Sequence, residues 1–208
     1  MEYDILHDHC VIDSSLWKEL KNADREKIIR NTGASFDPVK QCYRIPVLNE
    51  EFAVFPAEEK IEMLPDYKCV TQNEVDLCLF LLHYLLGAKD VPVSGEKISE
   101  KELKGGEMFF RGLHAIPTAD IKNRYGRNPE GLIKAGEKLS GRKAEFGDAS
   151  IQLTAAPKIT VIYVLWAADD EFPASVTVLF DPSIQEFLPL DVIFGMCIYI
   201  YKKLIINN

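Results

Sequence analysis

The spacing of apolar residues changes along the chain from a helical to a strand-like period, and this change predicts most of its elements. After Asp13, apolar residues recur every three to four positions, which predicts a helix over residues 14–31 with Asp13 as its cap. Two short apolar segments, 43–48 and 52–55, flank a polar turn and predict a hairpin, to which residues 61–64 add a third strand. The first part of the chain is therefore expected to contain one helix followed by short antiparallel strands.

The most apolar helix that the sequence predicts covers residues 73–88 and contains the segment LCLFLLHYLL. Thr71 and Glu74 have the spacing of a capping box, in which each side chain accepts a hydrogen bond from the backbone of the other residue. A helix that is apolar almost all round must be covered on most sides. We therefore expect this helix at the centre of the fold.

The rest of the chain predicts two short helices followed by a β-meander. Prolines at first-turn positions favour helices over about 117–125 and 129–140. The apolar period then changes to two over residues 151–154, 159–167 and 175–180, as in antiparallel strands. Both alternating sets of residues in the middle strand are apolar, which indicates a strand covered on both faces.

These elements predict the α+β class. The N-terminal hairpin and the C-terminal meander are expected to form an antiparallel sheet that packs on the central apolar helix. The sequence shows no repeat and no linker, so residues 1–208 are expected to form a single domain, with residues 1–12 as a candidate flexible arm.

Composition and charge exclude several classes of protein. The chain is 47% apolar and carries a net charge of −8, so it is expected to be globular and not to bind nucleic acid, which requires a surplus of Lys and Arg. Its longest apolar runs, 77–86 and 192–201, are shorter than the roughly 20 residues of a membrane span, and the N-terminus lacks the pattern of a signal peptide. The five cysteines are odd in number and widely spaced. We therefore expect a cytoplasmic protein with reduced thiols that does not associate with membranes.

Three consecutive acidic residues form the first candidate site. Asp169, Asp170 and Glu171 fall at the predicted tip of the hairpin between the last two strands. Their carboxylates could bind a hard cation such as Mg²⁺ or act as a general acid and base, which would make the protein a metal-dependent enzyme. The alternative is a polar turn, accompanied by a helix cap at Asp181.

Histidines provide two further candidates. His83 interrupts the apolar helix and could act as a buried acid, base or ligand, or be a core residue with a backbone partner. His7, His9 and Cys10 together offer two imidazoles and a thiolate that could hold Zn²⁺, but a stable structural zinc site needs four ligands. No matching ligand pair occurs elsewhere in the sequence.

Basic residues gather within 120–143, where seven basic residues face three acidic ones and give a local charge of +4. They are Lys122, Arg124, Arg127, Lys134, Lys138, Arg142 and Lys143. Lys122, Arg124, Arg127, Lys134 and Lys138 are candidates for binding an anionic ligand or an acidic partner. The alternative is a solvated helix face.

The order and the residues of several segments resemble those of a known family. RIPVLNEEFAVF, LLHYLLGAKDVPVSGEKISEKELKGGEMFF and GDASIQLTAAPKITVIYVLWAADDEFPASVTVLFDPSIQEFLP are similar to the bacterial and archaeal family called domain of unknown function 3786, over about residues 13–205. The family name carries no activity, so the resemblance implies an architecture and no catalytic residue. Some longer relatives are joined to a cysteine-rich iron–sulfur segment, which implies a setting in anaerobic redox or cofactor metabolism. This chain has no clustered cysteines with which to hold such a cluster itself.

No sequence motif fixes a reaction. The sequence contains no P-loop, no dinucleotide fingerprint, no nucleophile elbow and no HExxH pair. The leading hypothesis is therefore a non-catalytic accessory or binding module that serves a redox or iron–sulfur partner protein. A metal-dependent enzyme that uses residues 169–171 is the alternative.

Overall fold

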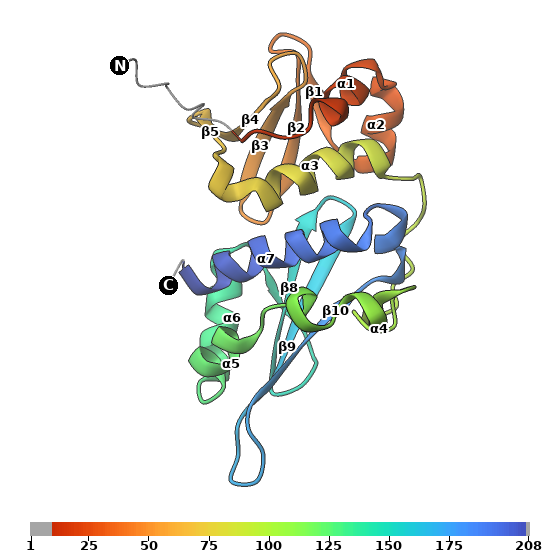
Figure 1. Cartoon of the computed structure of the whole chain (residues 1–208). Coiled ribbons are helices and arrows are strands. Elements are labelled where there is room, and N and C mark those ends of the chain that lie inside the picture. Colours follow the sequence, from red (N-terminus) through yellow and green to blue (C-terminus); the bar gives the residue numbers. More distant parts are fainter. Residues whose placement is uncertain (1–9, 207–208) are drawn as a thin grey trace, which may run out of the picture.

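The computed structural model describes residues 10–206 and shows two halves with the same order of elements: two helices, a β-meander and a long apolar helix (Figure 1). The first half contains α1 (Ser14–Asn22), α2 (Arg25–Thr32), β1 (Ser35–Asp37), β2 (Cys42–Val47), β3 (Glu50–Phe55), β4 (Lys60–Leu64), β5 (Lys68–Cys69) and α3 (Val75–Gly87). The second half contains α5 (Ala119–Tyr125), α6 (Pro129–Lys138), β7 (Arg142–Lys143), β8 (Ala149–Ala156), β9 (Ile159–Trp166), β10 (Ser175–Phe180) and α7 (Leu190–Ile206). Between the halves lie β6 (Ile98–Ser99) and α4 (Gly106–Phe109). Short 3₁₀ helices are η1 (Gln72–Glu74), η2 (Gly112–His114) and η3 (Pro182–Glu186).

Each half builds its own antiparallel five-stranded sheet. The first sheet has the order β1-β2-β3-β4-β5 and the second has the order β6-β10-β9-β8-β7. Helices α3 and α7 pack against each other between the two sheets (Figure 1). They run antiparallel, because Asp76 at the start of α3 pairs with Lys202 near the end of α7, with a distance of 3.3 Å between Oδ2 and Nζ.

Equivalent elements of the two halves meet. The second strands of the two meanders, β2 and β8, are in contact, and the N–H of Leu48 after β2 donates to the carbonyl of Thr154 in β8 at 3.0 Å. Glu50 at the start of β3 accepts hydrogen bonds from Tyr199 and Lys203 of α7 at 2.7 Å each. One hydrophobic cluster includes residues of both sheets and both long helices. The two halves repeat the order of their helices and strands but not their residues, so the sequence alone shows no repeat.

The α+β class expected from the sequence is confirmed, and the strand arrangement is corrected. The hairpin and the meander lie in two sheets instead of one, because the α3–α7 pair separates them. The helix expected over 14–31 is two helices, since Asp24 starts a new one by accepting a hydrogen bond from the Lys27 N–H at 3.2 Å. The expected capping box at Thr71 is also absent among the described residues; the 3₁₀ helix η1 leads into α3 instead.

The helix over 129–140 and the three strands of the meander are found at the expected places. Within residues 10–206, no helix has the length and apolar character needed to cross a membrane. The second sheet ends in the long loop between β9 and β10, which projects from the bottom of the molecule in Figure 1. This loop contains the acidic residues that the sequence singled out.

Candidate functional site

A groove of about 610 Å³ lies between α5 and the loop that joins β9 to β10. Its lining consists of Lys122, Asn123, Gly126, Arg127, Ala168, Asp169, Asp170, Glu171, Phe172, Pro173 and Ala174. We call it the charged groove, since one wall is basic and the other is acidic. The groove therefore brings together two sets of candidates that are separate in the sequence.

Gly126 at the end of α5 holds the two walls of the charged groove together. Its carbonyl accepts a hydrogen bond from the Ala168 N–H at 2.9 Å. A Cβ atom at this position would lie only 2.5 Å from the Cβ of Ala174, which is too close for any larger residue. The loop can approach α5 this closely because residue 126 is a glycine.

Asp169 uses its carboxylate to shape the loop. Its Oδ1 accepts hydrogen bonds from the backbone N–H groups of Phe172, at 2.6 Å, and Glu171, at 2.9 Å. The same two bonds lower the pKa of Asp169 below its usual value, since they stabilise the charged form. All three acidic residues are exposed on the loop. Asp169 in addition uses its carboxylate to hold the turn.

The structure forms no cluster of metal ligands in the described part of the chain. Within residues 10–206, no group of three or more His, Cys, Asp or Glu side chains is placed to hold a metal ion. His83 is half-buried on α3, away from the charged groove. Cys10 is buried in the core, where burial raises its pKa and its thiol forms a hydrogen bond with Cys78. His7 and His9 lie outside the described residues.

The basic candidates fall in different places. Lys122 and Arg127 line the charged groove. Arg124 instead donates from Nη1 to the carbonyl of Ile205 at the end of α7, at 2.6 Å. Lys134 and Lys138 are exposed on α6 and do not line the groove. Only two of the five therefore share a surface with the acidic loop.

Three exposed aromatic side chains gather at the same end of the second sheet, and we call them the aromatic end. Phe146, Trp166 and Phe172 are 40%, 43% and 66% exposed, and no other Phe, Tyr or Trp within residues 10–206 is classed as exposed. Phe172 also lines the charged groove. Phe172 is therefore the one residue that the aromatic end shares with the charged groove.

Backbone pairing brings the aromatic end together from distant parts of the sequence. Trp166 is the last residue of β9 and lies opposite Ser175, the first residue of β10. The loop that carries Phe146 lies beside β9, because the Asp148 N–H donates to the Leu165 carbonyl at 3.0 Å. Asp148 in turn accepts a hydrogen bond from the Ala167 N–H at 2.7 Å. These bonds hold the loops on both sides of Trp166.

Sequence reasoning did not identify the aromatic end. The strand over 159–167 was expected to be covered on both faces, and its residues Val161 to Leu165 are indeed buried. Trp166, the next residue, is the last of the strand and is 43% exposed. A tryptophan three positions before the acidic run is the sequence signal that could have indicated this surface.

Comparison with known proteins identifies the family of the chain. No curated protein and no solved structure matches it. One family model matches residues 24–203, which include most of both halves and all residues of the charged groove and the aromatic end. The chain therefore belongs to the family described as Domain of unknown function (DUF3786).

Proposed function

We propose that this protein is a non-catalytic binding module that docks onto a partner protein through its aromatic end. The observation that carries the proposal is the concentration of the exposed aromatic residues at one place. Aromatic side chains and arginine are enriched where proteins bind one another, and such anchors contribute most of the binding energy. Arg127 in the adjoining groove is the arginine of this surface.

The free energy of burying these side chains can be compared with the free-energy cost of association. Complete burial of one fully exposed large apolar side chain contributes roughly 1.5–3 kcal/mol. The three residues are 40%, 43% and 66% exposed, so burying what remains exposed contributes about 2–4 kcal/mol in total. The loss of translational and rotational freedom on association costs roughly 4–15 kcal/mol. The aromatic residues alone therefore offset only part of that cost, and further contacts must come from the charged groove.

The charges on the two walls of the groove indicate which kind of partner segment would bind there. Lys122 and Arg127 favour an acidic group on one side, and Asp170 and Glu171 favour a basic group on the other. A peptide segment with residues of both charges complements both walls, whereas a polyanion such as nucleic acid would be repelled by the acidic wall. The partner is therefore proposed to be a protein.

The class of partner to test first is a redox or iron–sulfur protein of anaerobic metabolism. This choice rests on the resemblance to longer relatives that carry a cysteine-rich segment. It is a separate part of the proposal, since the aromatic end and the groove specify a protein partner of any class.

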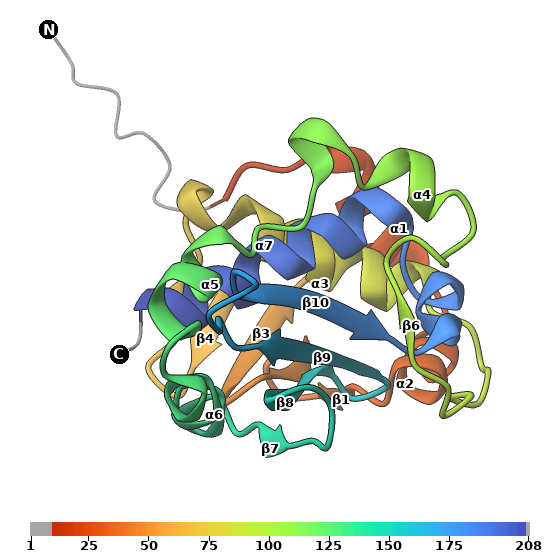
Figure 2. The ribbon, with the colours of Figure 1, turned by 90° about the horizontal axis from the view of Figure 1, so that it is seen from below.

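Affinity capture from the native host tests the proposal. The bait is the full chain with a tag, in three versions: the unchanged protein, a variant with Trp166→Ser and Phe172→Ser, and a control with Met108→Ser and Leu113→Ser. The control residues are also exposed, at 83% and 95%, and lie on α4 and η2, which Figure 2 shows on another side of the molecule from the β9–β10 loop. We expect the unchanged protein and the control to retain one partner that the Trp166 and Phe172 variant loses.

Two outcomes count against the proposal. A partner retained equally by all three baits would mean that the aromatic end is not the docking surface. A chain that elutes alone in every case, under gentle conditions and after cross-linking, would contradict a binding module altogether. The iron content of the captured protein then tests the redox part separately, because a partner without iron or another redox group removes only that part.

A further inference from the structure

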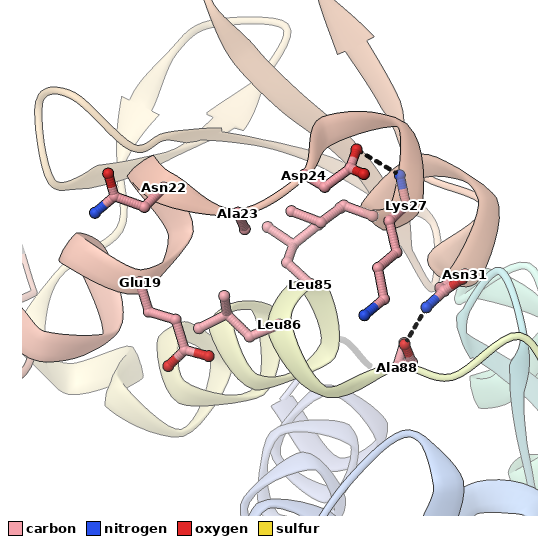
Figure 3. A pocket seen from close by; sticks show the side chains of 10 residues that line it. Glu19, Asn22, Ala23, Asp24, Lys27, Asn31, Leu85, Leu86 and Ala88 are labelled. Atoms are coloured by element: carbon pink, nitrogen blue, oxygen red, sulfur yellow. Dashed lines mark hydrogen bonds between the residues drawn. The ribbon is translucent and has the colours of Figure 1, made fainter.

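A second hollow lies in the first half of the molecule, between the corner that joins α1 to α2 and the end of α3 (Figure 3). Its volume is about 340 Å³, which is within the range of small-molecule sites. The floor is apolar and consists mainly of Ile28, Leu85 and Leu86. Ile28 and Leu85 are buried and Leu86 is half-buried, so the floor belongs to the core rather than to a mobile surface.

Two opposite charges flank this floor. Figure 3 shows Glu19 of α1 and Lys27 of α2 on opposite sides of the two leucines. Within residues 10–206, neither the Glu19 carboxylate nor the Lys27 ammonium has an ion-pair partner. The third charged residue, Asp24, is already engaged, since its carboxylate caps α2 by accepting from the Lys27 backbone N–H at 3.2 Å. Asp24 keeps its negative charge, but within residues 10–206 the Glu19 carboxylate and the Lys27 ammonium are the two charged groups of the pocket that no protein group engages.

Asn31 forms a polar edge of the pocket beside the apolar floor. Its side-chain Nδ2 donates to the carbonyl of Ala88 at the end of α3, at 2.7 Å, and the residue is buried. This bond ties α2 to the end of α3 at one side of the pocket (Figure 3). The distance between the walls is therefore set by a buried contact and not by the flexible side chains at the rim.

The second half of the molecule shows that such a hollow does not follow from the fold. There the corner between α5 and α6 is fastened to the end of α7: the Tyr125 hydroxyl donates to the Leu204 carbonyl at 2.9 Å and Arg124 donates to the Ile205 carbonyl at 2.6 Å. At the corresponding corner of the first half, Asn22 donates instead to the Lys18 carbonyl of its own helix at 2.8 Å. The space between the corner and α3 is left open.

We propose that this pocket binds a small zwitterion with an apolar side chain, the chemical class of the free aliphatic amino acids. The ligand ammonium would pair with Glu19, its carboxylate with Lys27, and its side chain would cover the apolar floor of Leu85 and Leu86. A simple carboxylic acid would leave the Glu19 carboxylate without a counter-charge beside the apolar part of the ligand. The proposal is independent of the docking surface at the other end of the molecule.

Titration calorimetry with three matched compounds tests the proposal. The probes are leucine, 4-methylpentanoate, which lacks the amino group, and 3-methylbutylamine, which lacks the carboxylate. Glu19 and Lys27 are exposed to solvent, and an exposed ion pair contributes less than about 1 kcal/mol, which corresponds to at most about 5-fold in affinity. We expect leucine to bind and each of the two analogues to bind about 2- to 5-fold more weakly. Binding of 4-methylpentanoate as tight as that of leucine would refute the zwitterion assignment, as would no binding of leucine at millimolar concentration.

Variants connect the binding to the named residues. Lys27→Met and Glu19→Gln should each weaken leucine binding by about 2- to 5-fold, since both side chains are exposed. The matched controls, Lys18→Met and Glu26→Gln, change exposed residues of the same two helices that do not line the pocket, and should leave the affinity unchanged. All four positions are exposed, and melting curves verify that each variant is folded. Leucine binding that is insensitive to both Lys27→Met and Glu19→Gln would place the ligand elsewhere and overturn the proposal.

Discussion

Asp181 joins the segment between the two halves to the second sheet, and its replacement by asparagine is the sharpest test of that connection. The residue is only 4% exposed and follows β10 directly. Its Oδ2 accepts a hydrogen bond from the Gly95 N–H at 2.7 Å, and its Oδ1 accepts from the backbone and the hydroxyl of Ser94 and of Ser183, at 2.6–3.1 Å. Asp181→Asn would place an amide NH₂ group against one of these donor sets, and one or more buried bonds would be lost.

The pKa of Asp181 gives the size of the effect. Burial alone would raise this pKa, but the hydrogen bonds from Ser183, Ser94 and Gly95 outweigh it and lower the pKa from 3.8 to about 2. Each pKa unit corresponds to about 1.4 kcal/mol, so the charged side chain stabilises the native state by about 2 kcal/mol. Because the native pKa is the lower one, this stabilisation is complete well above pH 3.8 and is lost as the pH falls towards 2.

Urea denaturation followed by far-UV circular dichroism measures this contribution. At pH 7, Asp181→Asn should lower the free energy of unfolding by about 2 kcal/mol and the melting temperature by about 4–8 °C. At pH 3 the difference in free energy should fall to about half. Asp170→Asn, on the exposed loop, is the matched control and should change stability by less than about 0.5 kcal/mol. A difference at Asp181 that is equally small at pH 7, or that stays constant between pH 7 and pH 3, would refute the reasoning.

Three further predictions concern packing between elements. Glu50→Gln should lower the free energy of unfolding by about 2 kcal/mol in urea denaturation, because Glu50 accepts hydrogen bonds from Tyr199 and Lys203 in a partly buried cluster. As a control, Lys21→Met breaks the exposed Lys21–Glu59 ion pair and should lower it by less than about 1 kcal/mol. Gly136→Ala should lower the melting temperature, because the added methyl group would lie 2.2 Å from Cγ1 of Ile151. The control Gly195→Ala in α7, where the nearest atom is the Asp76 carboxylate at 3.5 Å, should not lower it. Limited proteolysis should release no two stable halves split near residue 105, because one hydrophobic cluster includes residues of both sheets.

The local elements could be predicted from the sequence, since the apolar period depends only on the conformation of each segment. The three long strands of the second sheet, β8, β9 and β10, and the helix α6 were expected within a few residues of their bounds, whereas the two-residue edge strands β6 and β7 were not expected. The division into two sheets could not be predicted in this way. Alternation shows which residues of a strand face the core, but not which strand lies beside it. Contacts such as the single backbone bond between Leu48 and Thr154 leave no pattern in the sequence.

The candidate site shows the same limit. The acidic run at 169–171 located the loop correctly, because three charges in a row are rarely found inside a strand or a core. Phe146 and Trp166 are brought to that loop by the register of β8 with β9, in which Ala149 lies opposite Leu165. Pairing of this kind is set by the folded sheet, so two separate aromatic residues could not be recognised as one surface in advance.

Hydrogen–deuterium exchange of the protein with its captured partner tests the central claim most directly. If the partner docks on the aromatic end, amide exchange should slow in residues 145–148 and 166–174 and at the end of α5, and should stay unchanged in α4 and η2. Slower exchange confined to α4 and η2, or unchanged exchange in residues 166–174, would show that the partner binds elsewhere and would contradict the account.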